Sequence, residues 1–180
     1  DIAENDMDLM ELYFEQGELD EDQMRNGLHT AMLNRELFPI FVTSATEQIG
    51  PSRLMSFIDN VCPSPAERPV ETAEGEALPA DAAGETVGFV FRTMAEPHVG
   101  EYSFCRMYAG TLESGMDLEN ATSGNTERIG QLYAINGNER DNVPRLPAGD
   151  IGALVKLKDT HTNDTLRVKG TAVNIPPIEF

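Results

Sequence analysis

Two arginines, Arg140 and Arg145, lie close together with Asn138 and Asn142 in a polar stretch of the sequence. A guanidinium group presents a planar fork of donors that pairs with a phosphate, and protein amide groups commonly add further hydrogen bonds to it. These residues therefore predict a loop that contacts phosphate groups. A purely structural role for the two arginines stays open as the alternative.

The sequence otherwise lacks the residue patterns of a catalytic site. It holds no GxSxG, HExxH or GxGxxG motif, and its three histidines are isolated from one another. Cys62 and Cys105 have no CxxC spacing, so no zinc site or disulfide framework is indicated, and no other metal site is predicted. A GxxxxGKS/T phosphate loop is also missing. We therefore expect that this chain by itself is not catalytic.

The charge of the chain limits the partners that it can bind. A net charge of −18 argues against generic binding to nucleic acids, DNA included, because such binding needs clustered Lys and Arg that release counterions. The excess of acids lies mainly before residue 86, since residues 86–180 carry nine basic and twelve acidic side chains. Local basic contacts remain possible in this second part.

Signals for export or membrane insertion are not found. No charged segment followed by an apolar stretch opens the sequence, so we expect no signal peptide. The apolar runs are only a few residues long, far short of the roughly 20 that a membrane helix needs. These features predict a cytoplasmic protein with no membrane partner.

The first 65 residues read as helices around one strand. Apolar side chains recur at helical spacing over residues 4–34 and again over residues 51–61, where Gly50 precedes a proline that suits a helix start. Between them, the apolar run 38–42 suits a buried strand that enters a loop. Helix, strand, loop and helix in this order are typical of the closing stretch of an α/β domain.

The pattern then changes twice. Residues 63–85 are rich in prolines and acids and poor in large apolar side chains, so no packed element is expected there. From Val87 onward the apolar period becomes two, and turn signals recur up to Asp164. Several short strands at such spacing predict a small antiparallel barrel or sandwich.

Some single residues in the second part have predicted structural roles. Arg106 stands beside aromatic residues on a strand and is expected to stack and to form hydrogen bonds within the barrel. Four glycines are expected at turns that need a positive φ or a close backbone approach, namely Gly100, Gly110, Gly115 and Gly149.

The second part also carries a likeness to a known family. Residues 100–115, GEYSFCRMYAGTLESG, resemble a stretch of domain II of elongation factor G, and the likeness continues through residues 127–132, 148–153 and 157–160. In the first part, residues 38–45 are similar to the strand and loop that close the GTPase domain of this family. Residues 54–65 resemble its final helix and the exit toward domain II. The chain thus resembles a translational GTPase of the elongation factor G family over nearly its whole length.

Several positions depart from the family pattern. Thr43 replaces the usual glycine before Ser-Ala, and Glu101 stands where Lys or Arg is common. Lys156 and Asn163 occupy positions that are usually glycine. These departures indicate a divergent paralogue and leave the step of translation open.

The resemblance implies a fold and a domain order. It implies an α/β fragment, with helices around the terminal strand of a GTPase domain, followed by an all-β, antiparallel translation-factor β-barrel. The expected domains are the C-terminal part of the GTP-binding domain at residues 1–65, a linker at 66–85 and domain II at 86–180. We expect the fragment to be monomeric.

The resemblance also implies a function in protein biosynthesis. The intact protein would be a GTPase that binds GTP or GDP and Mg²⁺ through a phosphate loop upstream, whereas no cofactor is expected in this fragment. Three residues would contact the guanine base, namely Thr43, Ser44 and Ala45. Five would contact the small-subunit rRNA of the ribosome, namely His98, Gly100, Glu101, Arg140 and Arg145.

Two other functions stay open. A ribosome recycling factor or a ribosome-protection paralogue would have the same architecture. A non-ribosomal β-barrel binding module would share only the barrel pattern. This last alternative gives no reason for the Ser44-Ala45 and Pro63-Ser64-Pro65 segments, which occur upstream of the barrel in the family's order.

Overall fold

The computed structural model describes residues 2–96 and 100–179, and the chain divides into two compact units, residues 1–67 and 68–180. Residues 68–85, which the composition predicts to be a linker, belong to the second unit by their contacts. The expected domain limits themselves stay a prediction.

The first unit consists of short helices with well-formed ends. Asp6 caps α1 by accepting hydrogen bonds from the N–H groups of Asp8 and Leu9, and Asp20 forms a capping box with Gln23 at the start of α2. The helices predicted over residues 4–34 and 51–61 are thus confirmed. No helix among the described residues is long and apolar enough to cross a membrane. The helices of this unit are η1 (Ala3–Asn5), α1 (Met7–Gln16), α2 (Glu21–Leu33), α3 (Pro51–Val61) and η2 (Pro65–Glu67).

The strand predicted over residues 38–42 is not formed. This segment has no strand partner, and the side chains of Ile40 and Val42 are 91% and 94% exposed. A strand needs a neighbour to take its backbone hydrogen bonds, and the described residues of this unit contain no second strand. Residues 38–42 are therefore an exposed apolar segment that joins no β-sheet among the described residues.

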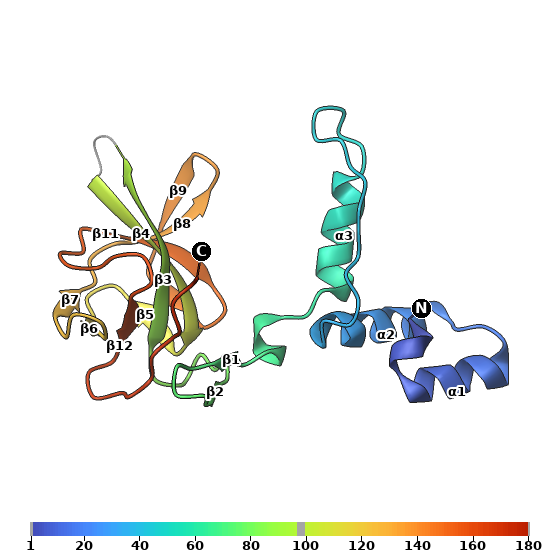
Figure 1. Ribbon diagram of the computed structural model, residues 1–180. Coiled ribbons are helices and arrows are strands. Elements are labelled where there is room, and N and C mark those ends of the chain that lie inside the picture. Colours follow the sequence, from blue (N-terminus) through green and yellow to red (C-terminus); the bar gives the residue numbers. More distant parts are fainter. Residues whose placement is uncertain (1, 97–99, 180) are drawn as a thin grey trace. The chain divides into compact units, whose positions relative to one another are not determined.

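The second unit is a β-barrel, as the family resemblance implies (Figure 1). Eight strands form one sheet in the order β7-β6-β12-β3-β4-β11-β8-β9, while β10 pairs with β5 and β1 with β2. Every pairing that the structure describes is antiparallel. The strands are β1 (Val70–Glu71), β2 (Ala77–Leu78), β3 (Val87–Glu96), β4 (Gly100–Ala109), β5 (Thr111–Glu113), β6 (Asp117–Asn120), β7 (Thr126–Arg128), β8 (Leu132–Asn136), β9 (Glu139–Val143), β10 (Arg145–Pro147), β11 (Ile151–Val155) and β12 (Thr165–Arg167).

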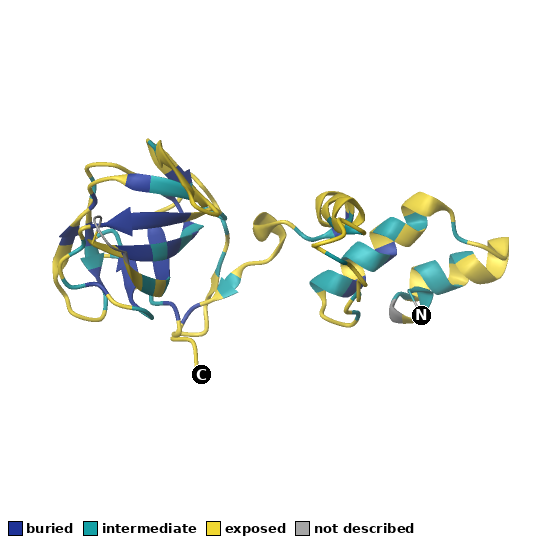
Figure 2. Cartoon of the chain, turned by 90° about the horizontal axis from the view of Figure 1, so that it is seen from above, coloured by how far each residue is buried: buried dark blue, intermediate teal, exposed yellow. Residues whose placement is uncertain are grey.

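The core of the barrel follows from the alternation along β4. Cys105 and Met107 are fully buried in the main hydrophobic cluster with Leu118, Leu154 and Leu166. The residues between them face the other side of the sheet, because successive side chains of a strand point to opposite faces. Figure 2 shows the buried residues concentrated in the strands of the barrel.

The proline-rich stretch before the barrel is more ordered than the sequence predicts. Strands β1 and β2 form a hairpin, and Val70 and Leu78 pack against a second hydrophobic cluster of the barrel. The N–H of Ala73 donates to the carbonyl of Asn174 at 2.8 Å. The expectation of no packed element is therefore wrong, because two aliphatic side chains and a few backbone bonds suffice to hold this segment.

Candidate functional site

The loop at residues 43–50 is a tight, exposed turn. Backbone hydrogen bonds of 2.9 and 3.0 Å join Ser44 and Ile49 in both directions. The Ser44 hydroxyl oxygen accepts a bond of 3.3 Å from the N–H of Glu47. Within the described residues, the N–H groups of Ala45 and Thr46 donate to no protein acceptor. The turn can therefore offer two backbone donors and a hydroxyl to a ligand.

Thr43 closes this turn against the start of α3. Gly50 has a φ of 90°, and a Cβ atom built on it would lie 2.9 Å from Cγ2 of Thr43. Only glycine avoids both the backbone strain and this contact. The side chain of Thr43 therefore occupies the space beside Gly50 and contributes to the shape of the turn.

Two hairpins of the barrel, β3–β4 and β8–β9, border a common cleft of about 270 Å³. Figure 1 shows both hairpins at the same end of the barrel. Met94, Tyr102 and Phe104 line the cleft from one hairpin, and residues 137–140 line it from the other. A guanidinium nitrogen of Arg140 donates to the Tyr102 hydroxyl at 2.5 Å. The structure thereby links the two regions that the family resemblance assigns to rRNA.

Gly100 and Glu101, two of the candidates for rRNA contact, lie at the start of β4. Gly100 begins β4 with a φ of 101°, and Glu101 is exposed opposite Ala95 of β3. His98 lies outside the described residues. A positive φ is confirmed for all four glycines that were expected to have one, namely Gly100, Gly110, Gly115 and Gly149.

Arg140 and Arg145 lie on different strands, so the prediction of one shared loop is wrong, whereas their contact with phosphate stays a prediction. Arg140 belongs to β9, whereas Arg145 begins β10 and pairs with Glu113 of β5 in a separate two-stranded sheet. Residues 139–142 of β9 are all exposed, so this strand lacks the apolar-polar alternation that identifies a strand in a sequence. Both arginine side chains are exposed.

The acidic side chains near the ends of the two hairpins do not favour the binding of a polyanion. Glu101, Glu139 and Asp141 are exposed there beside Arg140. Arg145 forms no ion pair among the described residues, and the exposed Glu113 lies opposite it on β5.

Comparison with known proteins identifies the barrel. The family model of elongation factor G domain 2 matches residues 85–169. The chain contains an elongation factor G domain 2. A crystal structure of a protein from Thermus thermophilus is similar, with a TM-score of 0.73 and 25% sequence identity over 94% of this chain. The chain spans 24% of the length of that protein.

The elongation factor G domain 2 contains a buried polar group that the sequence does not single out. Glu127 is only 2% exposed, and its carboxylate accepts hydrogen bonds from the N–H groups of Lys158 and Asp159 and from the hydroxyl of Thr160, at 2.6 to 3.0 Å. Because the chain contains many acidic residues, the sequence predicts that a glutamate such as Glu127 is solvent-exposed. Its three partners show that it fixes the loop after β11.

Two departures from the family pattern have a direct physical meaning. Lys156 and Asn163, which replace the usual glycines, have φ values of 62° and 78°. These positions thus need the left-handed conformation that glycine adopts most readily. The amide of Asn163 is also hydrogen-bonded to the backbone of Ile178 in both directions.

Proposed function

We propose that this chain is part of an elongation factor G-like GTPase that acts on the ribosome in translation. Within it, the 43–50 turn would contact the guanine base and the barrel would dock on small-subunit rRNA. The observation that carries the proposal is the family domain at residues 85–169, preceded in the family's order by the exposed Ser44-Ala45 turn.

The 43–50 turn suits the edge of a guanine base. The backbone donors of Ala45 and Thr46 match the acceptor atom O6 of guanine, and the Ser44 hydroxyl can donate or accept. No phosphate loop occurs in the sequence, so the nucleotide phosphates and Mg²⁺ would be held by other parts of the intact protein.

This division of labour can be tested with the purified 180-residue chain. We expect no GTP hydrolysis above buffer and no tight GTP binding by calorimetry, because one turn offers too few contacts to offset the cost of ordering a free nucleotide. A micromolar affinity for GTP would contradict the assignment of the phosphate site to other segments.

The docking of the barrel rests on Arg145. Its exposed guanidinium group forms no ion pair among the residues that the structure describes, whereas Arg140 is bonded to Tyr102. In the intact protein, Arg145→Glu should weaken ribosome binding and lower the log–log salt slope by roughly 0.7, if the rRNA behaves like a single strand. Binding is measured by cosedimentation at several salt concentrations.

Two further variants make this experiment specific. Lys169→Glu changes the net charge equally at another exposed position, and it should leave the slope unchanged. Glu101→Lys should strengthen binding, because it removes a negative charge from the hairpin tip. Equal effects of Arg145→Glu and Lys169→Glu would contradict a specific contact, and absence of ribosome binding would favour a non-ribosomal barrel module.

The step of translation is a separate question. Efficient translocation by the intact protein would assign it to elongation. Subunit splitting or drug release without translocation would instead identify a recycling or ribosome-protection paralogue.

A further inference from the structure

The outer face of the barrel carries an apolar groove with a single charged side chain in it. The groove has a volume of about 410 Å³, which lies in the range of ligand-binding pockets. We call it the Arg106 groove. Its walls include Phe91, Tyr108, Ile151, Ile175 and Ile178, and Arg106 lies between them.

Arg106 occupies an unusual position for a guanidinium group. It lies in β4, directly opposite Phe89 of β3 and Ile151 of β11. Its guanidinium carbon is 5.1 Å from the ring centre of Tyr108, a cation–π distance. The expected stacking is thus confirmed.

Arg106 was also expected to form hydrogen bonds within the barrel, but its side chain forms none with the described residues. Its Nε atom is buried and has no hydrogen-bond partner there. The other described residues that line the groove are all uncharged. A buried donor without a partner is destabilising, so its presence in the barrel calls for an explanation.

The wall formed by the C-terminal segment is fixed in place. The N–H of Ile175 donates to the Thr165 hydroxyl at 3.0 Å, and the N–H of Ile178 donates to the Asn163 side chain at 3.0 Å. This segment, coloured red in Figure 1, runs along the outside of the barrel. The groove is therefore formed before any partner binds.

We propose that the Arg106 groove binds a peptide segment in which a carboxylate side chain is flanked by large apolar side chains. The carboxylate would pair with the terminal nitrogens of the guanidinium fork, because the buried Nε atom is out of reach of a partner that binds from solvent. The apolar side chains would cover Ile151 and Ile178, which are 57% and 43% exposed. This site is distinct from the proposed contacts with nucleotide and rRNA.

The composition of the groove favours such a peptide over nucleic acid. Nucleic-acid affinity depends on several cations that neutralise phosphates, and Arg106 is the one cation among the described lining residues. The chain as a whole has a net charge of −18, which repels a polyanion more strongly than a peptide with one carboxylate. The apolar walls would also contact little of a phosphate backbone.

The test uses the 180-residue chain and two blocked peptides, Leu-Leu-Glu-Leu-Phe and its Leu-Leu-Gln-Leu-Phe analogue. We expect the glutamate peptide to shift the NMR signal of the Arg106 Nε–H and to bind at least tenfold more tightly than the glutamine peptide. Arg106→Gln should remove this tenfold preference, and Arg106→Lys should restore part of it. Arg128→Gln, at an exposed ion pair elsewhere, should leave it unchanged.

Three results would overturn the proposal. These are equal binding of the two peptides, shifts confined to residues outside the groove, and displacement of the glutamate peptide by a ten-nucleotide oligouridine at equimolar concentration. Because the Nε–H signal is recorded on the unaltered chain, the outcome does not depend on whether Arg106→Gln folds.

Discussion

The two units of this chain differ in where they keep their apolar side chains. In the barrel these side chains fill a closed core that includes Leu112, Leu118 and Leu154, each no more than 1% exposed. In the helical unit, Ala31 and Val61 are the buried hydrophobic residues among those described. Figure 2 shows the same contrast between buried strands and exposed helices.

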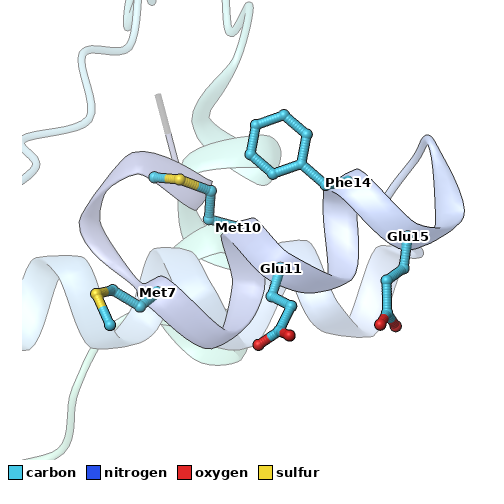
Figure 3. A pocket seen from close by; sticks show the side chains of 5 residues that line it. All are labelled: Met7, Met10, Glu11, Phe14 and Glu15. Atoms are coloured by element: carbon cyan, nitrogen blue, oxygen red, sulfur yellow. The ribbon is translucent and has the colours of Figure 1, made fainter.

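The helical unit leaves large apolar side chains in contact with solvent. Figure 3 shows α1 with Met7, Met10 and Phe14 beside two glutamates, and Met7 and Phe14 are 85% and 77% exposed. The apolar stretch 38–42 is exposed as well. Caps and local hydrogen bonds specify the helices, but little apolar surface is removed from water. The barrel should therefore hold most of the folding free energy.

Separating the units gives the largest expected effect. Residues 68–180 alone should unfold cooperatively, because their core is complete. Residues 1–67 alone should show a gradual loss of helix without a transition, because isolated short helices are marginal in water. Thermal unfolding followed by circular dichroism measures both. A sharp transition of the 1–67 fragment would break the comparison.

A truncation in each unit sharpens the same contrast. Leu154→Ala removes a side chain that is 1% exposed in the main cluster, and it should lower the free energy of unfolding of the barrel by about 3 kcal/mol. Met7→Ala, at an exposed position of α1, should change stability by no more than about 0.5 kcal/mol. Urea titrations of the full chain report these values, and a large effect of Met7→Ala would indicate that α1 is covered in solution.

Two glycines test how tightly the barrel backbone is packed. Gly110 and Gly124 have similar φ values, 68° and 72°, but a Cβ on Gly110 would lie 2.5 Å from Cα of Thr86, whereas that on Gly124 meets no atom within 4 Å. Gly110→Ala should therefore cost about 2 kcal/mol more than Gly124→Ala, since the backbone strain is shared and the overlap is not. If urea titrations gave equal losses of unfolding free energy for the two variants, the backbone around Gly110 and Thr86 would be able to shift and relieve the overlap.

The barrel was more predictable from the sequence than the helical unit, for a physical reason. Its strands bury one face, so the alternation around Cys105 and Met107 appears in the sequence. Residues 38–42 have an equally clear strand composition, but pairing depends on a neighbour that composition does not reveal. The β9 strand was missed for the opposite reason, because both faces of residues 139–142 are exposed and only Val143 is partly buried.

The candidate site was predictable only in part. The exposure of Glu101, Arg140 and Arg145 was foreseeable, since charged side chains seldom lie inside a protein. The bond from Arg140 to Tyr102 was not, because it joins strands 38 residues apart in the sequence. The unpaired Nε of Arg106 likewise depends on which residues face it across two neighbouring strands.

The smallest expected effect concerns a polar contact that joins helices within the first unit. His29 of α2 lies 2.8 Å from the carbonyl oxygen of Val61 and 2.8 Å from the carboxylate of Glu67. Both partners are acceptors, so only the imidazolium form, with two N–H groups, can satisfy both. The Val61 carbonyl and, to a smaller extent, Glu67 raise the pKa of His29, although burial opposes them. The N–H of Ser64, together with His29, lowers the pKa of Glu67.

The direction of the pH dependence follows from these two shifts. Because the pKa of His29 is raised on folding, its contribution to stability is complete below its ordinary value of 6.5 and is lost as the pH rises through the folded pKa. Because the pKa of Glu67 is lowered, its contribution is present above 4.5 and is lost as the pH falls through the folded pKa. The contact should thus be strongest between pH 4.5 and 6.5. NMR titration of the His29 ring should give a lower pKa in Glu67→Gln and no change in Glu47→Gln, and an unaltered titration in Glu67→Gln would show that the carboxylate does not hold the ring. The effect on stability should be the smallest of those considered, because the contact is partly exposed and water screens it.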